Sequence, residues 1–277
     1  MSTTARRPAP APPSVREISL RTFFLATFAF SWVLGALMVV FVDQVEAVFG
    51  PISYTNPVFV LVVWGPGLVG LALVARHHGV QGLRGLLARL TLWRMSRTWW
   101  LVLLVGMPAV FYLGAAVKGT LDEGFPFSPW YAVLPALLPA LLIGPVEELG
   151  WRGVALPLLQ RRLAPLWAAL VVGVIAAVWH TPAFLMSGTK QSAWSFGPFF
   201  LGVVAISVIL TAMFNAAHGS LLVAVLFHAQ MNGPAWPDAQ PWDMYGFVLV
   251  AVLVVLLNRR TMLARGSGST DVLLDSR

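Results

Sequence analysis

Long apolar runs separated by short polar segments dominate the pattern of this 277-residue chain. A run of about 20 apolar residues is long enough to cross a bilayer as a helix. Runs of this kind fall at 22–42, 57–75, 98–117, 130–158, 164–185, 198–216, 219–234 and 242–258. The pattern therefore predicts an all-α, polytopic membrane protein with about eight transmembrane helices. We expect one helical domain over 21–260, flanked by cytosolic tails at 1–20 and 261–277.

The basic residues predict how these spans are oriented. Arginines gather in the two tails and in alternate connections, whereas Lys118 and Lys190 fall in the other set of connections. Cytosolic loops of membrane proteins carry an excess of Lys and Arg. Eight spans with both termini in the cytosol satisfy this rule, and a bacterial cytoplasmic membrane is the expected location. The net charge of +7 follows from this asymmetry, so no nucleic-acid partner is expected.

Composition agrees with a membrane protein. Hydrophobic residues make up 58% of the chain and charged residues 10%, which is about half the charged fraction of a typical soluble domain. There is no cysteine, so a disulfide framework, a thiolate metal site and a cysteine nucleophile are all excluded.

Two segments outside the spans have patterns of their own. Between the second and third spans, 79–100 carries apolar residues at helical spacing with arginines between them, and this predicts an amphipathic helix on the inner leaflet. Its apolar residues are Leu83, Leu86, Leu87, Leu90 and Trp93. The Pro-rich N-terminal tail and the Gly/Ser-rich stretch at 266–270 are predicted to be disordered.

Acidic and basic side chains occur inside three of the apolar spans. Glu147 and Glu148 lie in the fourth span, His180 in the fifth and His228 in the seventh. A carboxylate at membrane depth costs at least about 2.5–3.5 kcal/mol, so such residues persist mainly where they form pairs or carry out chemistry. The sequence therefore indicates a catalytic site within the membrane.

Helix geometry separates the roles of the two glutamates. Adjacent residues point about 100° apart on a helix, so Glu147 and Glu148 cannot both face one site. Glu148 and Arg152 are four residues apart, and we expect them to form an ion pair that leaves Glu147 available for chemistry. Pro145 cannot donate a backbone hydrogen bond, which predicts irregular backbone just before the pair.

Depth along the helices predicts that these groups meet. Counted from the hairpin at 161–162, Glu147 and His180 both lie about 25 Å along their helices, at about 1.5 Å per residue. His228 and Asn232 are four residues apart in the seventh span, so they share one face of that helix. Their depth overlaps with that of Glu147 and His180. Four polar side chains from three helices are therefore expected to converge in one layer.

The remaining polar residues of interest have ordinary explanations. His77, His78 and His218 fall in predicted cytosolic loops and are expected to be surface residues. Asn215, near the inner end of its span, is expected to cap the helix or to bind a neighbouring polar group.

The converging groups suit hydrolysis of a carbonyl compound, with peptide bonds as the obvious substrate. A glutamate and a histidine can activate a water molecule, and a histidine with an asparagine amide can donate hydrogen bonds to an oxyanion. Other protease chemistries fit poorly, because both lysines lie outside the spans and there is no His-Glu-x-x-His helix.

The three motifs resemble those of a known family. Glu147-Glu148-x-x-x-Arg152, His180 followed by Pro182, and His228-x-x-x-Asn232 are similar to the motifs of the CAAX prenyl endopeptidase and bacteriocin-processing (CPBP, or Abi) membrane proteases. The resemblance covers about 135–235, and the eight-helix all-α architecture of the family agrees with the span count.

The resemblance implies a role for each motif residue. Glu147 and His180 would activate the water, His228 and Asn232 would stabilise the oxyanion, and Glu148 and Arg152 would support the site. One departure is visible, because the family often has Phe four residues before the motif-two histidine, where this chain has Ala176.

A metal is not required by the sequence. The family is commonly called a metalloprotease family, and Glu147, His180 and His228 could form a three-ligand zinc site. A zinc-bound Glu147 would not be free as a base, however, which favours water activated by Glu147 and His180.

The expected substrate is a membrane-associated peptide or protein, taken up within the lipid bilayer. Two alternatives remain at this stage. One is a proton-coupled transporter, in which the intramembrane ionisable groups form a relay. The other is a non-catalytic immunity or scaffold protein that keeps the same fold.

Overall fold

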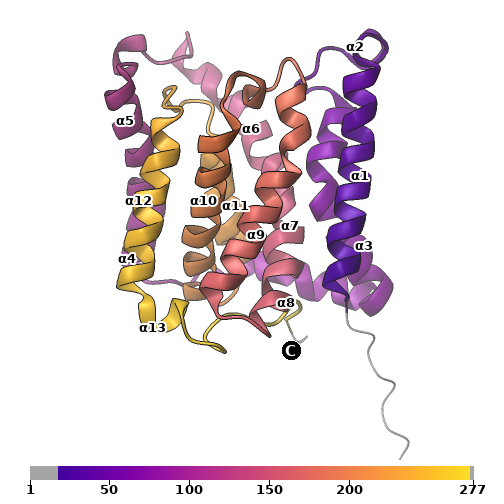
Figure 1. Ribbon diagram of the computed structural model, residues 1–277, viewed down its shortest axis with the longest axis vertical. Coiled ribbons are helices and arrows are strands. Elements are labelled where there is room, and N and C mark those ends of the chain that lie inside the picture. Colours follow the sequence, from indigo (N-terminus) through magenta and orange to yellow (C-terminus); the bar gives the residue numbers. More distant parts are fainter. Residues whose placement is uncertain (1–17, 275–277) are drawn as a thin grey trace, which may run out of the picture.

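The computed structural model describes residues 18–274, so residues 1–17 and 275–277, and with them most of the predicted N-terminal tail, lie outside the described part. The regular secondary structure of the described residues is helical throughout (Figure 1). Six helical segments are long and apolar enough to cross a membrane, and two further apolar helices are shorter. The predicted all-α, polytopic architecture is therefore confirmed.

The helices follow the predicted spans in order, with breaks inside several of them. The α-helices are α1 (Leu20–Val40), α2 (Val42–Phe49), α3 (Pro57–Leu87), α4 (Arg97–Leu101), α5 (Met107–Lys118), α6 (Val133–Leu142), α7 (Glu148–Gly150), α8 (Leu156–Gln160), α9 (Pro165–Trp179), α10 (Phe196–Ala216), α11 (Leu221–Met231), α12 (Trp242–Leu257) and α13 (Arg259–Met262). A π-helical turn joins α4 to α5, and the chain from α6 to α8 forms one broken span, Trp130–Gln160.

The most deeply buried span is α10, which packs against α9 on one side and α12 on the other. On the far side of the bundle α1 packs along α3, and α3 in turn contacts the broken span (Figure 1). Glycines allow α3 and α7 to pack closely. A Cβ on Gly70 would lie only 3.0 Å from the Cα of Gly150. A Cβ on Gly150 would likewise overlap the carbonyl oxygen of Pro66. The broken span is thus held directly against the α3 backbone.

The segment predicted as a surface helix over 79–100 is shorter and more buried than expected. Gly79 adopts a φ of 62°, which glycine accepts without strain, and this bends the end of α3 beneath the bundle. The apolar stripe is divided, because Leu86 is fully buried and Leu83 and Leu90 pack on the core. Leu87 and Trp93 remain exposed. The helical turns end at Thr91. The predicted helix is therefore shorter than expected, and part of its apolar stripe packs on the protein.

Arg89, one of the arginines between the apolar residues of the predicted surface helix, is buried at the end of this segment. Its Nε donates to the carbonyl of Gly219 at 2.9 Å, and its Nη1 donates to the carbonyls of Gly153 at 3.0 Å and Val272 at 3.2 Å. The guanidinium also lies over the ring of Phe214, 5.1 Å from its centroid. One side chain thus joins three segments that are far apart in the sequence.

The Gly/Ser-rich stretch at 266–270 is docked on the bundle, so its predicted disorder was wrong. The backbone N–H of Ser269 donates to Asn215 Oδ1 at 3.0 Å, and Gln160 Nε2 donates to the Ser269 carbonyl at 2.8 Å. Gln160 and Asn215 also bind each other through both amide groups. The polar composition suggested disorder, but partly buried side-chain amides form hydrogen bonds with the backbone of this stretch. The expected hydrogen-bonding role of Asn215 is confirmed.

Candidate active site in the broken span

The backbone that carries the two glutamates changes helical type three times within one span. Gly144–Glu147 is a 3₁₀ turn, Glu148–Gly150 is α-helical, and Trp151–Ala155 is a π-helical turn that leads into α8. Pro145 has no N–H to donate, which disturbs the regular hydrogen-bond ladder at this point. Short π-helical turns are frequent at functional sites. The irregular backbone predicted beside Pro145 is confirmed.

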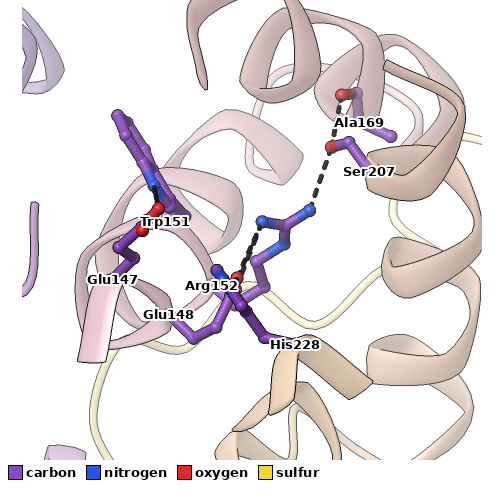
Figure 2. A network of polar contacts seen from close by, with 7 residues as sticks. All are labelled: Glu147, Glu148, Trp151, Arg152, Ala169, Ser207 and His228. Carbon is purple, nitrogen blue, oxygen red and sulfur yellow. Dashed lines mark hydrogen bonds and ion pairs between the residues drawn. The ribbon is translucent and has the colours of Figure 1, made fainter. Parts of the chain in front are cut away.

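The expected ion pair between Glu148 and Arg152 is present and buried. Arg152 Nη1 lies 3.2 Å from Glu148 Oε2, and both side chains are almost completely shielded from solvent. On its other side Arg152 Nη2 donates to Ser207 Oγ at 3.1 Å, and Ser207 donates to the carbonyl of Ala169 at 2.8 Å (Figure 2). Arg152 is therefore fixed between the broken span, α9 and α10.

Glu148 has a second partner that the sequence did not reveal. His228 Nδ1 lies 2.7 Å from Glu148 Oε1, so α11 is tied to the broken span by the same carboxylate (Figure 2). A carboxylate in an ion pair accepts hydrogen bonds, which makes Nδ1 the protonated nitrogen of His228. Nε2 is then the ring atom left for chemistry, and Glu148 sets its direction.

Glu147 stands apart from this network. Its side chain diverges from that of Glu148, as expected for helical neighbours, and its Oε2 accepts a 3.2 Å hydrogen bond from Trp151 Nε1 (Figure 2). Trp151 is itself wedged edge-on between Phe23 and Trp179. Glu147 is only 3% exposed. A buried carboxylate with a neutral partner is thus available beside the ion pair, as the helix geometry predicted.

His180 follows directly after α9 and is held by backbone and aromatic contacts. Its Nδ1 lies 2.7 Å from the carbonyl oxygen of Ala176, which can only accept, so Nδ1 donates and Nε2 is left as an acceptor. The rings of Trp179 and Phe199 meet the imidazole edge-on at 4.7 and 5.3 Å. Phe199 on α10 therefore supplies an aromatic contact to the histidine although position 176 is alanine.

The four residues predicted to be catalytic line the same two adjoining cavities, of about 60 and 130 Å³. These residues are Glu147, His180, His228 and Asn232. A water molecule needs roughly 10–15 Å³ by this kind of measure, so the cavities can hold several waters or a substrate side chain. The convergence expected from helix depth is therefore found, although the roles of the residues stay predictions.

Gly144 is a residue of the site that the sequence reasoning missed. A Cβ at this position would overlap Asn232 Nδ2 and would lie 2.9 Å from His228 Nε2. The absence of a side chain at Gly144 is what allows both groups to reach the broken span. The only local signal in the sequence was a glycine directly before Pro145 and three residues before Glu147.

Tyr54, in the connection between α2 and α3, was also missed and lines both cavities. Burial and, to a smaller degree, the nearby charge of Glu147 raise the pKa of the Tyr54 hydroxyl above its usual value. The phenol therefore stays neutral at physiological pH and can donate a hydrogen bond into the site.

A zinc site is not preformed by the candidate ligands. Within residues 18–274, no group of three or more His, Asp or Glu side chains is arranged to hold a metal ion. Glu147, His180 and His228 line common cavities but do not form a ligand set in this structure. The hydrogen bonds of both imidazoles use Nδ1 and leave Nε2 as the ring atom that could bind a metal.

Comparison with known proteins gives a family match in the part of the chain that carries the motifs. Residues 129–233 match the family model of Rce1-like type II CAAX prenyl endopeptidases. A stretch of 141 residues is 31% identical to CAAX prenyl protease 2 of Methanococcus maripaludis and covers 46% of this chain. The chain spans about half the length of that curated relative, 51% of it. The region around the broken span and α9–α11 is thus similar to the Rce1-like type II CAAX prenyl endopeptidases, as its three motifs indicated.

Proposed function

We propose that this protein is an intramembrane endopeptidase that hydrolyses peptide bonds of membrane-associated substrates. The observation that carries the proposal is the lining of the two cavities, where a carboxylate, two imidazoles and an amide meet from three separate helical segments. The match of residues 129–233 to a family of endopeptidases supports the same reaction class.

Glu147 and His180 activate the attacking water in this mechanism. The Trp151 indole orients one oxygen of Glu147, and Ala176 fixes His180 with Nε2 as the proton acceptor. A positioned base of this kind takes a proton from water as the water attacks the carbonyl carbon. The proton then passes to the amine that leaves when the C–N bond breaks.

Asn232 and His228 stabilise the negative charge that develops on the carbonyl oxygen. The Asn232 amide is a donor in any protonation state, and it projects beside Gly144, which has no side chain to fill the space. His228 donates from Nε2 only when its ring carries both protons, because Glu148 already accepts the hydrogen bond from Nδ1. Asn232 is therefore the primary oxyanion donor, and the Glu148–Arg152 pair positions His228 beside it.

The surroundings of the site define the class of substrate. The cavities lie between helices that are apolar enough to cross a membrane, so membrane-associated polypeptides are the substrates that suit them best. A bacterial cytoplasmic membrane with both termini in the cytosol fits the distribution of arginines. The name of the M. maripaludis relative makes prenylated peptides the first substrates to test.

Purified protein in detergent, incubated with quenched fluorogenic peptides with and without a C-terminal prenyl group, tests this function. Cleavage at a defined bond, located by mass spectrometry, supports the endopeptidase. Proton-linked uptake by proteoliposomes without any cleavage would instead support a transporter, and the absence of both would support a non-catalytic protein.

Asn232→Ala is expected to lower kcat by roughly 10²–10³-fold with little change in substrate binding, because one oxyanion donor is lost. Asn232→Asp should be at least as damaging, since a carboxylate repels the developing charge. His228→Gln keeps a donor and should retain more activity than His228→Ala. Steady-state kinetics on these variants provide the test, and an active Asn232→Asp enzyme would rule out the oxyanion role.

Removal of metal should leave the activity largely intact. Protein treated with a chelator until no zinc is detected by elemental analysis is expected to keep most of its activity, because Glu147 and His180 activate water without a metal. Loss of activity on chelation, recovered in proportion to added Zn²⁺, would contradict this mechanism.

A further inference from the structure

The two ends of the helical bundle differ sharply in charge. Within residues 18–274, every arginine except Arg152 lies at one end, at the start of α1, the end of α3, the start of α4, the α8–α9 connection or around α13 (Figure 1). The opposite end consists of the connections 50–56, 119–132, 186–195 and 232–241, which contain no arginine. The positive-inside rule places the arginine-rich end in the cytosol.

Two of the candidate catalytic residues lie at the arginine-poor ends of their helices, whereas Glu147 lies near the middle of the broken span. His180 is the residue after the last turn of α9, and Asn232 is the residue after the last turn of α11. Both helices begin at the arginine-rich end, so His180 lies about 22 Å from the start of α9 at about 1.5 Å per residue. The site is thus displaced from the cytosolic end of the bundle.

The cavities themselves reach the arginine-poor connections. Tyr54 and Gln191 line both cavities, and Lys190 and Trp194 line the larger one. These side chains come from the connections before α3 and before α10, both at the arginine-poor end. No residue of the arginine-rich connections lines either cavity.

The cytosolic end is closed beneath the site. Leu86, Leu156, Phe214 and Leu221 are all essentially inaccessible and belong to one packed cluster between the site and the arginine-rich connections. Arg89 closes the same end by binding carbonyls of three segments. In the part of the chain that the structure describes, the cavities lined by Glu147 therefore do not extend to the arginine-rich end.

We propose that the active site opens to the extracytoplasmic side and takes as substrates the extracytoplasmic segments of membrane-anchored polypeptides, next to the membrane. The inference rests on the proposed endopeptidase function and specifies which side of the membrane supplies the peptide. The Tyr54, Lys190, Gln191 and Trp194 side chains form the entrance that such a segment passes.

The absence of cysteine makes the direction of opening directly measurable. Three single-cysteine variants suffice, with Gln191→Cys at the entrance, Ser187→Cys on the same connection and Ala264→Cys at the arginine-rich end. Treatment of intact spheroplasts with a membrane-impermeant thiol reagent is expected to label Ser187→Cys and Gln191→Cys, and to label Ala264→Cys only after permeabilisation. The reverse pattern would overturn the proposal whether or not the protein is active.

The side of substrate uptake is tested with right-side-out and inverted membrane vesicles from the same cells. A charged fluorogenic peptide added outside should be cleaved about tenfold or more faster by right-side-out vesicles, because charged groups do not cross the apolar core readily. Glu147→Gln vesicles give the background from other proteases, and detergent should equalise the two preparations. Equal or faster cleavage by inverted vesicles would overturn the inference. The absence of cleavage even in detergent would instead overturn the proposed function, while the labelling result still determines the direction of opening.

Discussion

Replacement of Glu147 by Ala or Gln is expected to reduce peptide hydrolysis by at least about 10²–10⁴-fold, the contribution of a positioned general base. The protein should still insert and purify normally, because Glu147 is not part of the buried ion pair. Its only hydrogen bond in the described structure comes from the neutral Trp151 indole, so its loss leaves no charge unpaired. The measurement is kcat/KM on a fluorogenic peptide, together with the yield and thermal transition of each variant.

Glu147→Gln is the sharper of the two variants, because the amide oxygen keeps an acceptor for Trp151 while the basic group is lost. Glu123→Gln, an exposed change in the connection after α5, serves as the matched control and should keep full activity. A Glu147→Gln protein that retains the wild-type kcat would remove Glu147 from the mechanism.

Glu148→Ala is expected to destabilise the protein by about 3–5 kcal/mol, the usual cost of removing one partner of a buried ion pair. Arg152 would remain buried without its carboxylate, and His228 would lose the group that orients its ring. The folded yield and the apparent Tm in detergent should both fall, and any protein recovered should also have a reduced kcat.

Replacement of both Glu148 and Arg152 shows whether the instability of Glu148→Ala comes from the unpaired charge of Arg152. In the double variant Glu148→Ala with Arg152→Met no charge is left unpaired, so part of the lost Tm should return, although His228 stays unsupported. A Glu148→Ala protein that is fully stable and inactive, beside a Glu147→Ala protein that is active, would show that the two glutamates have the opposite roles.

The parts of the fold that follow from local spacing could be predicted. The apolar runs located the helices, and the four-residue spacing of Glu148 and Arg152 predicted their ion pair. The equal distance of Glu147 and His180 from one hairpin predicted that both reach the same layer. In each case the information is contained in helix periodicity and rise, which depend on neighbouring residues only.

The contacts that depend on tertiary packing could not be predicted. Glu148 and His228 are 80 residues apart, and no periodic pattern links a residue on the broken span to one on α11. Gly144 is important because it has no side chain that would overlap Asn232. A single sequence gives no reason to expect glycine at this position. Polar composition suggested disorder at 266–270, whereas the surrounding amides of Gln160 and Asn215 bind this stretch.

The three residues whose carbonyl groups bind Arg89 are translated at very different times. Gly153 follows Arg89 by 64 residues, Gly219 by 130 and Val272 by 183. At about 5–20 residues per second, the last acceptor leaves the ribosome roughly 10–40 s after the arginine itself. Until Val272 is made, the guanidinium cannot bind all three of its acceptors. Closure of the arginine-rich end is thus a late event in biogenesis, which cannot be complete before almost the whole chain has been translated.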